Sequence, residues 1–214
     1  MYKVSFLLAP GVGQPFSLQG DAAGEAATGI FPGLCGYVQT AAVPGQENPG
    51  FSGVIECFFS RASDALAAAD ADPSALLSEE VSILSVVAGM ERVVMRAPAC
   101  FGTDQVKGVY PFRRKQGMSV ADFQDYWWHS HGPIAARTEE ALSYIQIHPL
   151  PECYAGGDAE YDGITEIAWP DMEAAMRGVT SRQMQEDQAT DASKFVDRES
   201  VSLFFAKADV IIAP

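Results

Sequence analysis

The chain lacks the residue patterns that mark metal and cofactor sites. It has three histidines and four cysteines, and the cysteines are widely spaced, at Cys35, Cys57, Cys100 and Cys153. Without a CxxC pair, neither a zinc site nor a disulfide framework is predicted. The sequence also has no phosphate loop, nucleotide-binding glycine fingerprint, nucleophilic serine elbow or carboxylate–histidine metal spacing. We therefore expect neither a metal ion nor a cofactor.

Positive charge is scarce as well. Against 28 Asp and Glu there are 14 Lys and Arg, which gives a net charge of −14 and a pI near 4.5. Such a surface repels phosphate backbones and anionic bilayers, so we expect neither nucleic acid nor membrane as a partner. No segment approaches the roughly 20 apolar residues that cross a bilayer, and the short apolar N-terminal run lacks a signal-peptide cleavage site. We expect a cytoplasmic protein with a small-molecule substrate.

The scarce residue types gather in one segment, residues 113–133. This segment holds two of the three histidines, two of the three tryptophans and the basic run from Arg113 to Lys115. Histidine is the side chain whose ordinary pKa suits proton transfer near neutral pH. The sequence therefore indicates that any acid–base chemistry occurs here.

The two halves of the chain share a weak internal repeat. Residues 2–6, 36–40 and 51–56 resemble residues 106–110, 143–147 and 161–166, in that order. Each half follows the pattern strand, helix, strand, strand, helix, strand, which is the ferredoxin-like order of an antiparallel sheet with helices on one face. We predict an α+β fold with two tandem ferredoxin-like repeats, a degenerate first one at 1–97 and a second at 106–214. The linker between them is expected at 97–105.

A helix is predicted at residues 119–131, with Ser119 as its N-cap. One face carries Val120, Phe123, Trp127 and His131, so His131 is expected to point inward. His129 lies about 200° around the helix axis from His131, which argues against one metal bound by both. Gly132-Pro133 is expected to end the helix. The helix end favours a charged His131 and burial a neutral one, so the direction of its pKa stays open.

The predicted strand at 144–148 alternates strictly, so one face carries Tyr144, Gln146 and His148. These polar groups line either a cavity or solvent. The preceding Arg113 and Arg114 could hold a carboxylate or phenolate. Each candidate has a structural alternative: a hydrogen-bonded core histidine, tryptophans that only pack, and arginines at a solvated strand end.

Several of these residues form a pattern of a known family. The pattern comprises Arg113-Arg114-Lys115-x-Gly117-Met118-Ser119, Phe123, Tyr126-Trp127, His131-Gly132-Pro133, Tyr144-x-Gln146 and Phe195-x-Asp197. It resembles the EthD family of the dimeric α+β barrel superfamily. The first half matches only at Tyr37-x-Gln39 and Gly53-x-x-Glu56, and residues 16–28 contain neither Trp nor His. The resemblance implies a pseudodimeric α+β barrel, with pockets between sheet and helices, whose site lies in the second half alone.

The sequence and the resemblance together favour acid–base catalysis without a cofactor. We predict an isomerase or lyase acting on a small unsaturated oxo or hydroxy acid from aromatic ring cleavage. Arg113 or Arg114 would hold its carboxylate, and His131 would move a proton. Tyr144 or His148 would be the partner of His131 in this transfer.

Further substrate contacts are predicted from Tyr126, Trp127 and Gln146. Two alternatives remain open. The first is an aromatic polyketide cyclase or cofactor-free oxygenase, in which apolar walls matter more than the arginines. The second is a non-catalytic ligand-binding or structural barrel, which predicts a His131 satisfied by backbone groups with no cavity beside it. A homodimer also remains open, because the fused repeat could complete a barrel without a second chain.

Overall fold

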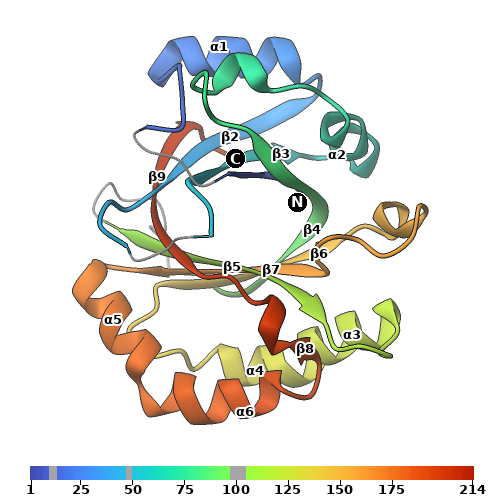
Figure 1. Ribbon diagram of the computed structural model, residues 1–214, viewed down its shortest axis with the longest axis vertical. Helices are drawn as coiled ribbons and strands as arrows, with labels where there is room; N and C mark the ends of the chain where they lie inside the picture. The colour runs from blue at the N-terminus through green and yellow to red at the C-terminus, as the bar shows by residue number, and fades with distance from the viewer. Residues whose placement is uncertain (10–13, 47–49, 97–104) are drawn as a thin grey trace. The chain divides into compact units, whose positions relative to one another are not determined.

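In the computed structural model, the described residues (1–9, 14–46, 50–96 and 105–214) form two compact units, drawn in Figure 1. The first unit comprises Met1–Glu91, Pro149–Asp158 and Ala206–Pro214, and the second comprises Arg92–His148 and Ala159–Phe205. Each unit is a mixed α+β structure with an antiparallel sheet and helices, which confirms the predicted fold class. The predicted linker lies outside the described residues apart from Gln105.

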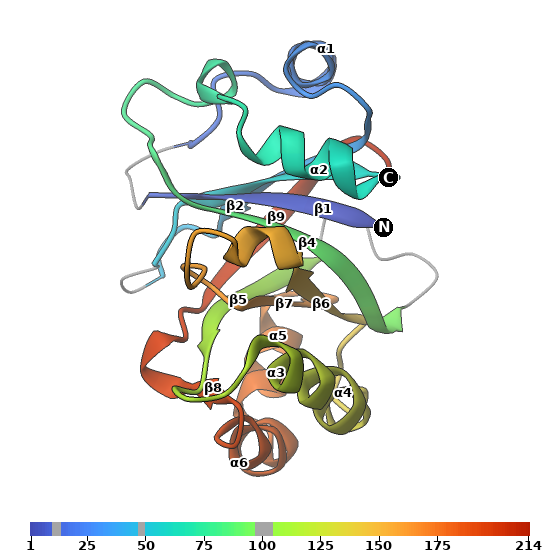
Figure 2. The same ribbon diagram turned by 90° about the vertical axis from the view of Figure 1, so that its right-hand side faces the viewer.

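The first unit contains a sheet in the order β4-β1-β3-β2-β9, with every neighbouring pair antiparallel. Its elements are β1 (Tyr2–Leu8), α1 (Gly20–Ile30), β2 (Leu34–Ala42), β3 (Gly53–Phe59), α2 (Ala62–Ala69), the 3-10 turns η1 (Ser74–Leu76) and η3 (Pro151–Tyr154), β4 (Ile83–Arg96) and β9 (Phe204–Ile212). Figure 2 shows α1 and α2 on the same side of β1 and β2. The last strand of the chain, β9, pairs with β2 of the first half.

The second unit contains the sheet β6-β7-β5-β8, also antiparallel at the pairs β6–β7, β7–β5 and β5–β8. Its elements are β5 (Val106–Arg114), α3 (Val120–Tyr126), the π-helix η2 (Trp127–His131), α4 (Gly132–Ala135), β6 (Ser143–Pro149), β7 (Gly163–Trp169), α5 (Met172–Thr180), the π-helix η4 (Gln183–Gln188), α6 (Ala189–Ala192), β8 (Val196–Asp197) and the 3-10 turn η5 (Arg198–Ser200). In Figure 1 the helices α3 to α6 lie on one side of β5 and β7. No described helix is both long and apolar enough to cross a bilayer.

The strand register confirms the internal repeat. In the first half Ser5 pairs with Glu56 and Gln39 with Ile55. In the second half the matching positions pair in the same way: Val109 with Glu166, and Gln146 with Thr165. Because a shift of one residue would turn every side chain to the other face, equal registers place equivalent residues on equivalent faces.

The helix predicted to end at Gly132-Pro133 continues to Ala135, so that prediction is wrong. Its beginning is as expected, since the Ser119 hydroxyl accepts a hydrogen bond from the Asp122 amide at 3.1 Å. After Tyr126 the backbone widens into a π-turn, in which the Gly132 amide bonds the Trp127 carbonyl five residues back. A proline in an α-helix lacks a donor and its ring clashes with the carbonyl four residues earlier. We attribute the tolerance of Pro133 to the wider turn.

Candidate active site

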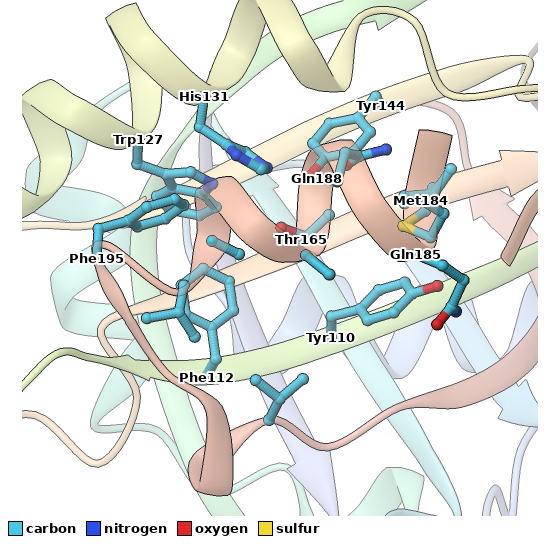
Figure 3. Close-up of a pocket in the computed structure, with 15 residues that line it drawn as sticks. Tyr110, Phe112, Trp127, His131, Tyr144, Thr165, Met184, Gln185, Gln188 and Phe195 are labelled. Carbon is cyan, nitrogen blue, oxygen red and sulfur yellow. The ribbon is translucent and has the colours of Figure 1, made fainter. Parts of the chain in front are cut away.

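A cavity of about 210 Å³ lies inside the second unit, between the sheet and its helices (Figure 3). The sheet contributes Tyr110, Phe112, Tyr144, Thr165 and Ile167, and the helical side contributes residues of the π-helices η2 and η4, of α6 and of the segment after it. Among the described residues that line the cavity, none is Lys, Arg, Asp or Glu. The cavity is therefore largely apolar with a few polar groups, as ligand sites commonly are.

His131 lines this cavity and is paired with an aspartate from the opposite helix. It is only 4% exposed, and its Nδ1 lies 2.9 Å from Oδ2 of Asp191, which is also buried. An ionised carboxylate only accepts hydrogen bonds, so a neutral His131 carries its proton on Nδ1 and a lone pair on Nε2. Nε2 has no hydrogen bond with any residue that the structure describes. It is therefore the nitrogen available to a ligand.

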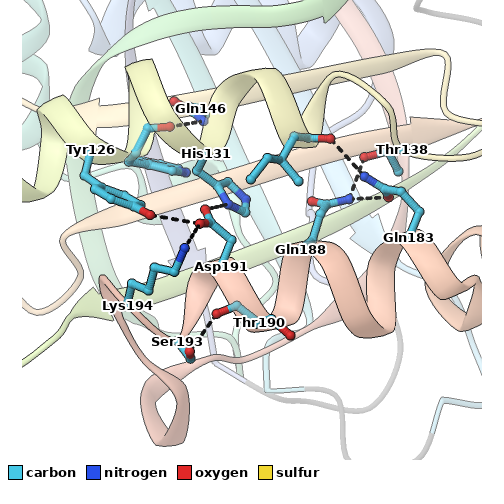
Figure 4. Close-up of polar contacts among 12 residues, drawn as sticks. Tyr126, His131, Thr138, Gln146, Gln183, Gln188, Thr190, Asp191, Ser193 and Lys194 are labelled. Atoms are coloured by element: carbon cyan, nitrogen blue, oxygen red, sulfur yellow. Dashed lines mark hydrogen bonds and ion pairs between the residues drawn. The ribbon is translucent and has the colours of Figure 1, made fainter.

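Asp191 is held by two further donors, shown in Figure 4. The Tyr126 hydroxyl and the Lys194 ammonium both donate to its Oδ1, each at 2.8 Å. Burial alone would raise the pKa of Asp191, but the bonds from Lys194, His131 and Tyr126 outweigh it and lower the pKa. The carboxylate is thus ionised, and it fixes the orientation of the imidazole as in a His–Asp pair of a catalytic triad.

Burial decides the pKa of His131, which the sequence left open. Desolvation lowers this pKa below its ordinary value, and the hydrogen bond and charge of Asp191 oppose the shift without cancelling it. His131 is therefore neutral at physiological pH. A neutral imidazole with a free Nε2 can act as a general base.

Tyr144 lies on the cavity floor with Tyr110, and both phenols remain protonated. Burial raises the pKa of Tyr144 to about 12, and a hydrogen bond that its oxygen accepts from Thr165 partly compensates. Burial also raises the pKa of Tyr110 well above its usual range, and the Tyr110 hydroxyl is buried without a partner among the described residues. Both side chains are hydrogen-bond donors and poor bases at neutral pH.

Gln146 and His148 share the strand face of Tyr144 but do not line the cavity. Gln146 donates from Nε2 to the Trp127 carbonyl at 3.1 Å and accepts from His148 Nε2 at 2.9 Å. The His148 ring stacks on Trp127 with a centroid distance of 4.3 Å. Burial, assisted by the charge of Arg92, lowers the pKa of His148 to about 3. Both residues thus contact Trp127 without lining the cavity themselves.

The structure places Arg113 and Arg114 away from the cavity lining. The Arg113 side chain is exposed and donates from Nε to the Glu160 carbonyl at 2.7 Å. Arg114 forms an ion pair with the buried Asp162 and also donates to the Met118 carbonyl at 2.9 Å. Tyr126 likewise does not line the cavity and contacts Asp191 instead. Of the predicted residues, the cavity brings together His131, Trp127 and Tyr144.

Two residues of the site were not predicted from the sequence: Gln188, which lines the cavity, and Asp191, which bonds His131. They lie in the acidic stretch Gln183-Met184-Gln185-Glu186-Asp187-Gln188-Ala189-Thr190-Asp191, where nothing distinguishes one carboxylate from its neighbours. The contact of Asp191 with a residue 60 positions earlier has no local signal in the sequence. Among the described residues, no group of three or more His, Cys, Asp or Glu could hold a metal ion.

Comparison with known proteins supports this assignment of fold. Residues 115–199 match the EthD domain family. An anthrone oxidase-like protein is 8% identical to this chain with a TM-score of 0.58, over 98% of this chain and 92% of its own. A mutant chlorite dismutase from Candidatus Nitrospira defluvii is 13% identical with a TM-score of 0.53, over 96% of this chain and 91% of its own. No curated protein matches the chain in sequence.

The two units and these solved structures define the class of fold, which is a mixed α+β, ferredoxin-like fold with antiparallel sheets and helices. Within the second half of the chain, residues 115–199 are similar to the EthD domain family. The resemblance seen in residues 113–197 is thereby confirmed. The EthD match includes both His131 and Asp191, the two residues of the buried pair.

Proposed function

We propose that this protein is a small-molecule enzyme in which His131 removes a proton from an uncharged, planar aromatic ketone or phenol. The observation that carries the proposal is the buried His131–Asp191 pair beside an apolar cavity. Cofactor-independent proton transfer requires a base with a free nitrogen and a site that excludes water. A cavity beside His131 also argues against a purely structural barrel.

In the proposed reaction, Nε2 of His131 accepts a proton from an activated C–H or O–H of the substrate. The imidazolium that forms is stabilised by Asp191, which Tyr126 and Lys194 hold in place. The aromatic side chains Phe112, Trp127 and Phe195 would hold the planar rings. Return of the proton to another atom completes a tautomerisation, which is an isomerase reaction.

The ring-cleavage acid predicted from the sequence has less support than an aromatic substrate. That substrate would need a cation for its carboxylate, and neither Arg113 nor Arg114 lines the cavity. The likeness in fold to an anthrone oxidase-like protein favours the alternative of an aromatic polyketide-type substrate. Proton removal is the first step that an anthrone-type isomerisation and a cofactor-free oxygenation would share.

Deuterium exchange tests this proposal directly. Anthrone has an acidic methylene group, and its exchange in D2O without dioxygen reports proton removal alone. We expect the wild-type protein to accelerate this exchange and His131→Gln to lower the acceleration by about 10² to 10⁴, the usual contribution of a general base. His129→Gln is the matched control, because His129 is 65% exposed and pairs only with the exposed Asp125. Full exchange activity in His131→Gln would contradict the proposal.

A further inference from the structure

A second polar group of the cavity, the Gln188 amide, has an orientation that its neighbours determine. Gln188 is 4% exposed and lines the cavity from η4. Its Nε2 donates to Thr138 Oγ1 at 2.9 Å and to Gln183 Oε1 at 2.8 Å. Both hydrogens of the amide nitrogen are therefore used within the protein.

Two backbone carbonyls fix the direction of every bond in this network. Gln183 donates from Nε2 to the Ile134 carbonyl at 2.9 Å, and Thr138 donates to the Ala135 carbonyl at 2.7 Å. Because a carbonyl can only accept, Gln183 must present its Oε1 to Gln188, and Thr138 must present a lone pair. The Gln188 amide thus has one allowed orientation, with nitrogen toward the network.

The remaining atom, Gln188 Oε1, accepts no hydrogen bond from the residues that the structure describes. It is also absent from the fully buried atoms without a partner, so it retains surface in the cavity. Figure 4 shows this oxygen turned toward His131 and the amide nitrogen turned toward Gln183 and Thr138. His131 Nε2 and Gln188 Oε1 are therefore both available to the cavity as acceptors.

We propose that Gln188 is a specificity-determining residue that selects aromatic substrates carrying a second hydroxyl or N–H donor in addition to the group deprotonated by His131. This inference rests on the proposed function and adds the chemical class of the substrate: a planar aromatic compound with two hydrogen-bond donors. A ligand without the second donor leaves Gln188 Oε1 desolvated and unpaired, which lowers its affinity.

Calorimetric titration with naphthols tests the inference. The probes are 2,3-, 2,6- and 2,7-dihydroxynaphthalene, each compared with the fluoronaphthol in which fluorine replaces the second hydroxyl. Fluorine is no larger than hydroxyl and cannot donate, so the comparison isolates the donor. For at least one pair, we expect the dihydroxy compound to bind wild-type protein about tenfold more tightly, as for a hydrogen bond that is otherwise left unmade.

The Gln188→Met variant should bring the affinity ratio of dihydroxynaphthalene to fluoronaphthol close to one. It should bind the fluoronaphthol as tightly as wild-type protein does. Gln183→Met, outside the cavity lining, releases the Gln188 amide from its fixed orientation and should lower the ratio by a smaller factor. His129→Gln is the control and should leave the ratio unchanged, since the exposed His129 does not line the cavity.

The outcomes separate failure of the inference from failure of the proposed function. A ratio near one for all three pairs in wild-type protein, or a ratio kept in Gln188→Met, overturns the role of Gln188 alone. If Gln188→Met fails to fold, the affinity ratios of wild-type protein and of Gln183→Met still test the role of Gln188. Two results would overturn the proposed function itself. The first is that fumarate binds and none of the naphthols does, and the second is that His131→Gln leaves the naphthol affinities unchanged.

Discussion

The two halves of this chain have the same sheet but differently built helices. A buried lysine–glutamate ion pair occupies the same repeat position in each, Lys3 with Glu56 at 2.5 Å and Lys107 with Glu166 at 3.3 Å. A glutamine of the second strand in each half donates to a backbone carbonyl, that of Leu18 from Gln39 and that of Trp127 from Gln146. The two halves thus share the ion pair and the glutamine–carbonyl hydrogen bond at equivalent positions of the sheet.

The helix that follows the first strand differs between the halves. In the first half α1 buries only Ala23, Gly24 and Ala27. These small residues pack into a continuous core that includes Phe6, Phe31 and Tyr37. In the second half the corresponding helix buries Phe123, Trp127 and His131, and a π-turn carries the last two. Large side chains at the helix allow a cavity whose walls are aromatic.

Equivalent glycines show the same difference. A Cβ on Gly53 would lie 2.5 Å from the Thr40 carbonyl oxygen, a backbone contact of the sheet. A Cβ on Gly163 would lie 2.6 Å from the Trp127 ring. Gly53 therefore permits a close approach of two strands, whereas Gly163 leaves room for the cavity wall. The two halves thus share a sheet, and only the helices of the second half present large buried side chains beside the cavity at His131.

The lysine–glutamate ion pairs are common to both halves, and we expect their removal to have the largest effect on stability. Removing one partner of a buried pair leaves an uncompensated charge, which costs about 3 to 5 kcal/mol. We expect Glu56→Gln to lower the free energy of unfolding by that amount. Glu166→Gln should cost less, because the Lys107 side chain is 13% exposed against 1% for Lys3.

Urea unfolding at pH 7 measures these costs. Glu173→Gln is the control, since the Glu173 side chain is 86% exposed in its ion pair with Arg177 and such pairs contribute about 1 kcal/mol or less. If Glu166→Gln lowered the free energy of unfolding no more than Glu173→Gln does, the ion pair would not stabilise both halves.

His148 distinguishes the two halves, because Ala41 occupies the equivalent position in the first half. The folded-state pKa of about 3 lies below the ordinary 6.5. Between these values the unfolded chain binds more protons than the folded one, so stability is complete above pH 6.5 and falls as the pH drops toward 3. At about 1.4 kcal/mol per pH unit, His148 should account for a loss of about 2 kcal/mol between pH 6.5 and 5.

The measurement is the pH dependence of urea unfolding in wild-type protein and in His148→Ala. The variant makes the second half like the first and should lose about 2 kcal/mol less over this interval. His129→Ala, which removes an exposed histidine, should keep the wild-type slope. An unchanged slope in His148→Ala would mean that protonation of this residue does not affect stability.

Much of the fold could be predicted from the sequence because it depends on local patterns. The alternation of residues 144–148 indicates a strand, and Ser119 indicates where the helix begins. The continuation of the helix past Pro133 could not be predicted, since it depends on a π-turn whose Trp127 carbonyl is also bonded by Gln146 from another strand. Local rules for proline do not include such a contact.

The site was predictable only on one side. His131 and Trp127 are scarce residue types at helical spacing, so their inward direction follows from periodicity, whereas the alternation around Tyr144 left its face open between cavity and solvent. Asp191 and Gln188 lie in an acidic, amide-rich segment without a distinctive pattern, and only tertiary packing brings them to His131. The same holds for Arg114, which forms an ion pair with Asp162, 48 positions away, and does not line the cavity.

Asp191 holds a neutral His131 with its proton on Nδ1 and its Nε2 available to a ligand. Nitrogen-15 NMR of the histidine rings across a pH titration measures both the tautomer and the pKa. We predict an Nδ1–H tautomer for His131 and a pKa below 6.5. An Nε2–H tautomer, or a pKa above 6.5, would contradict the account.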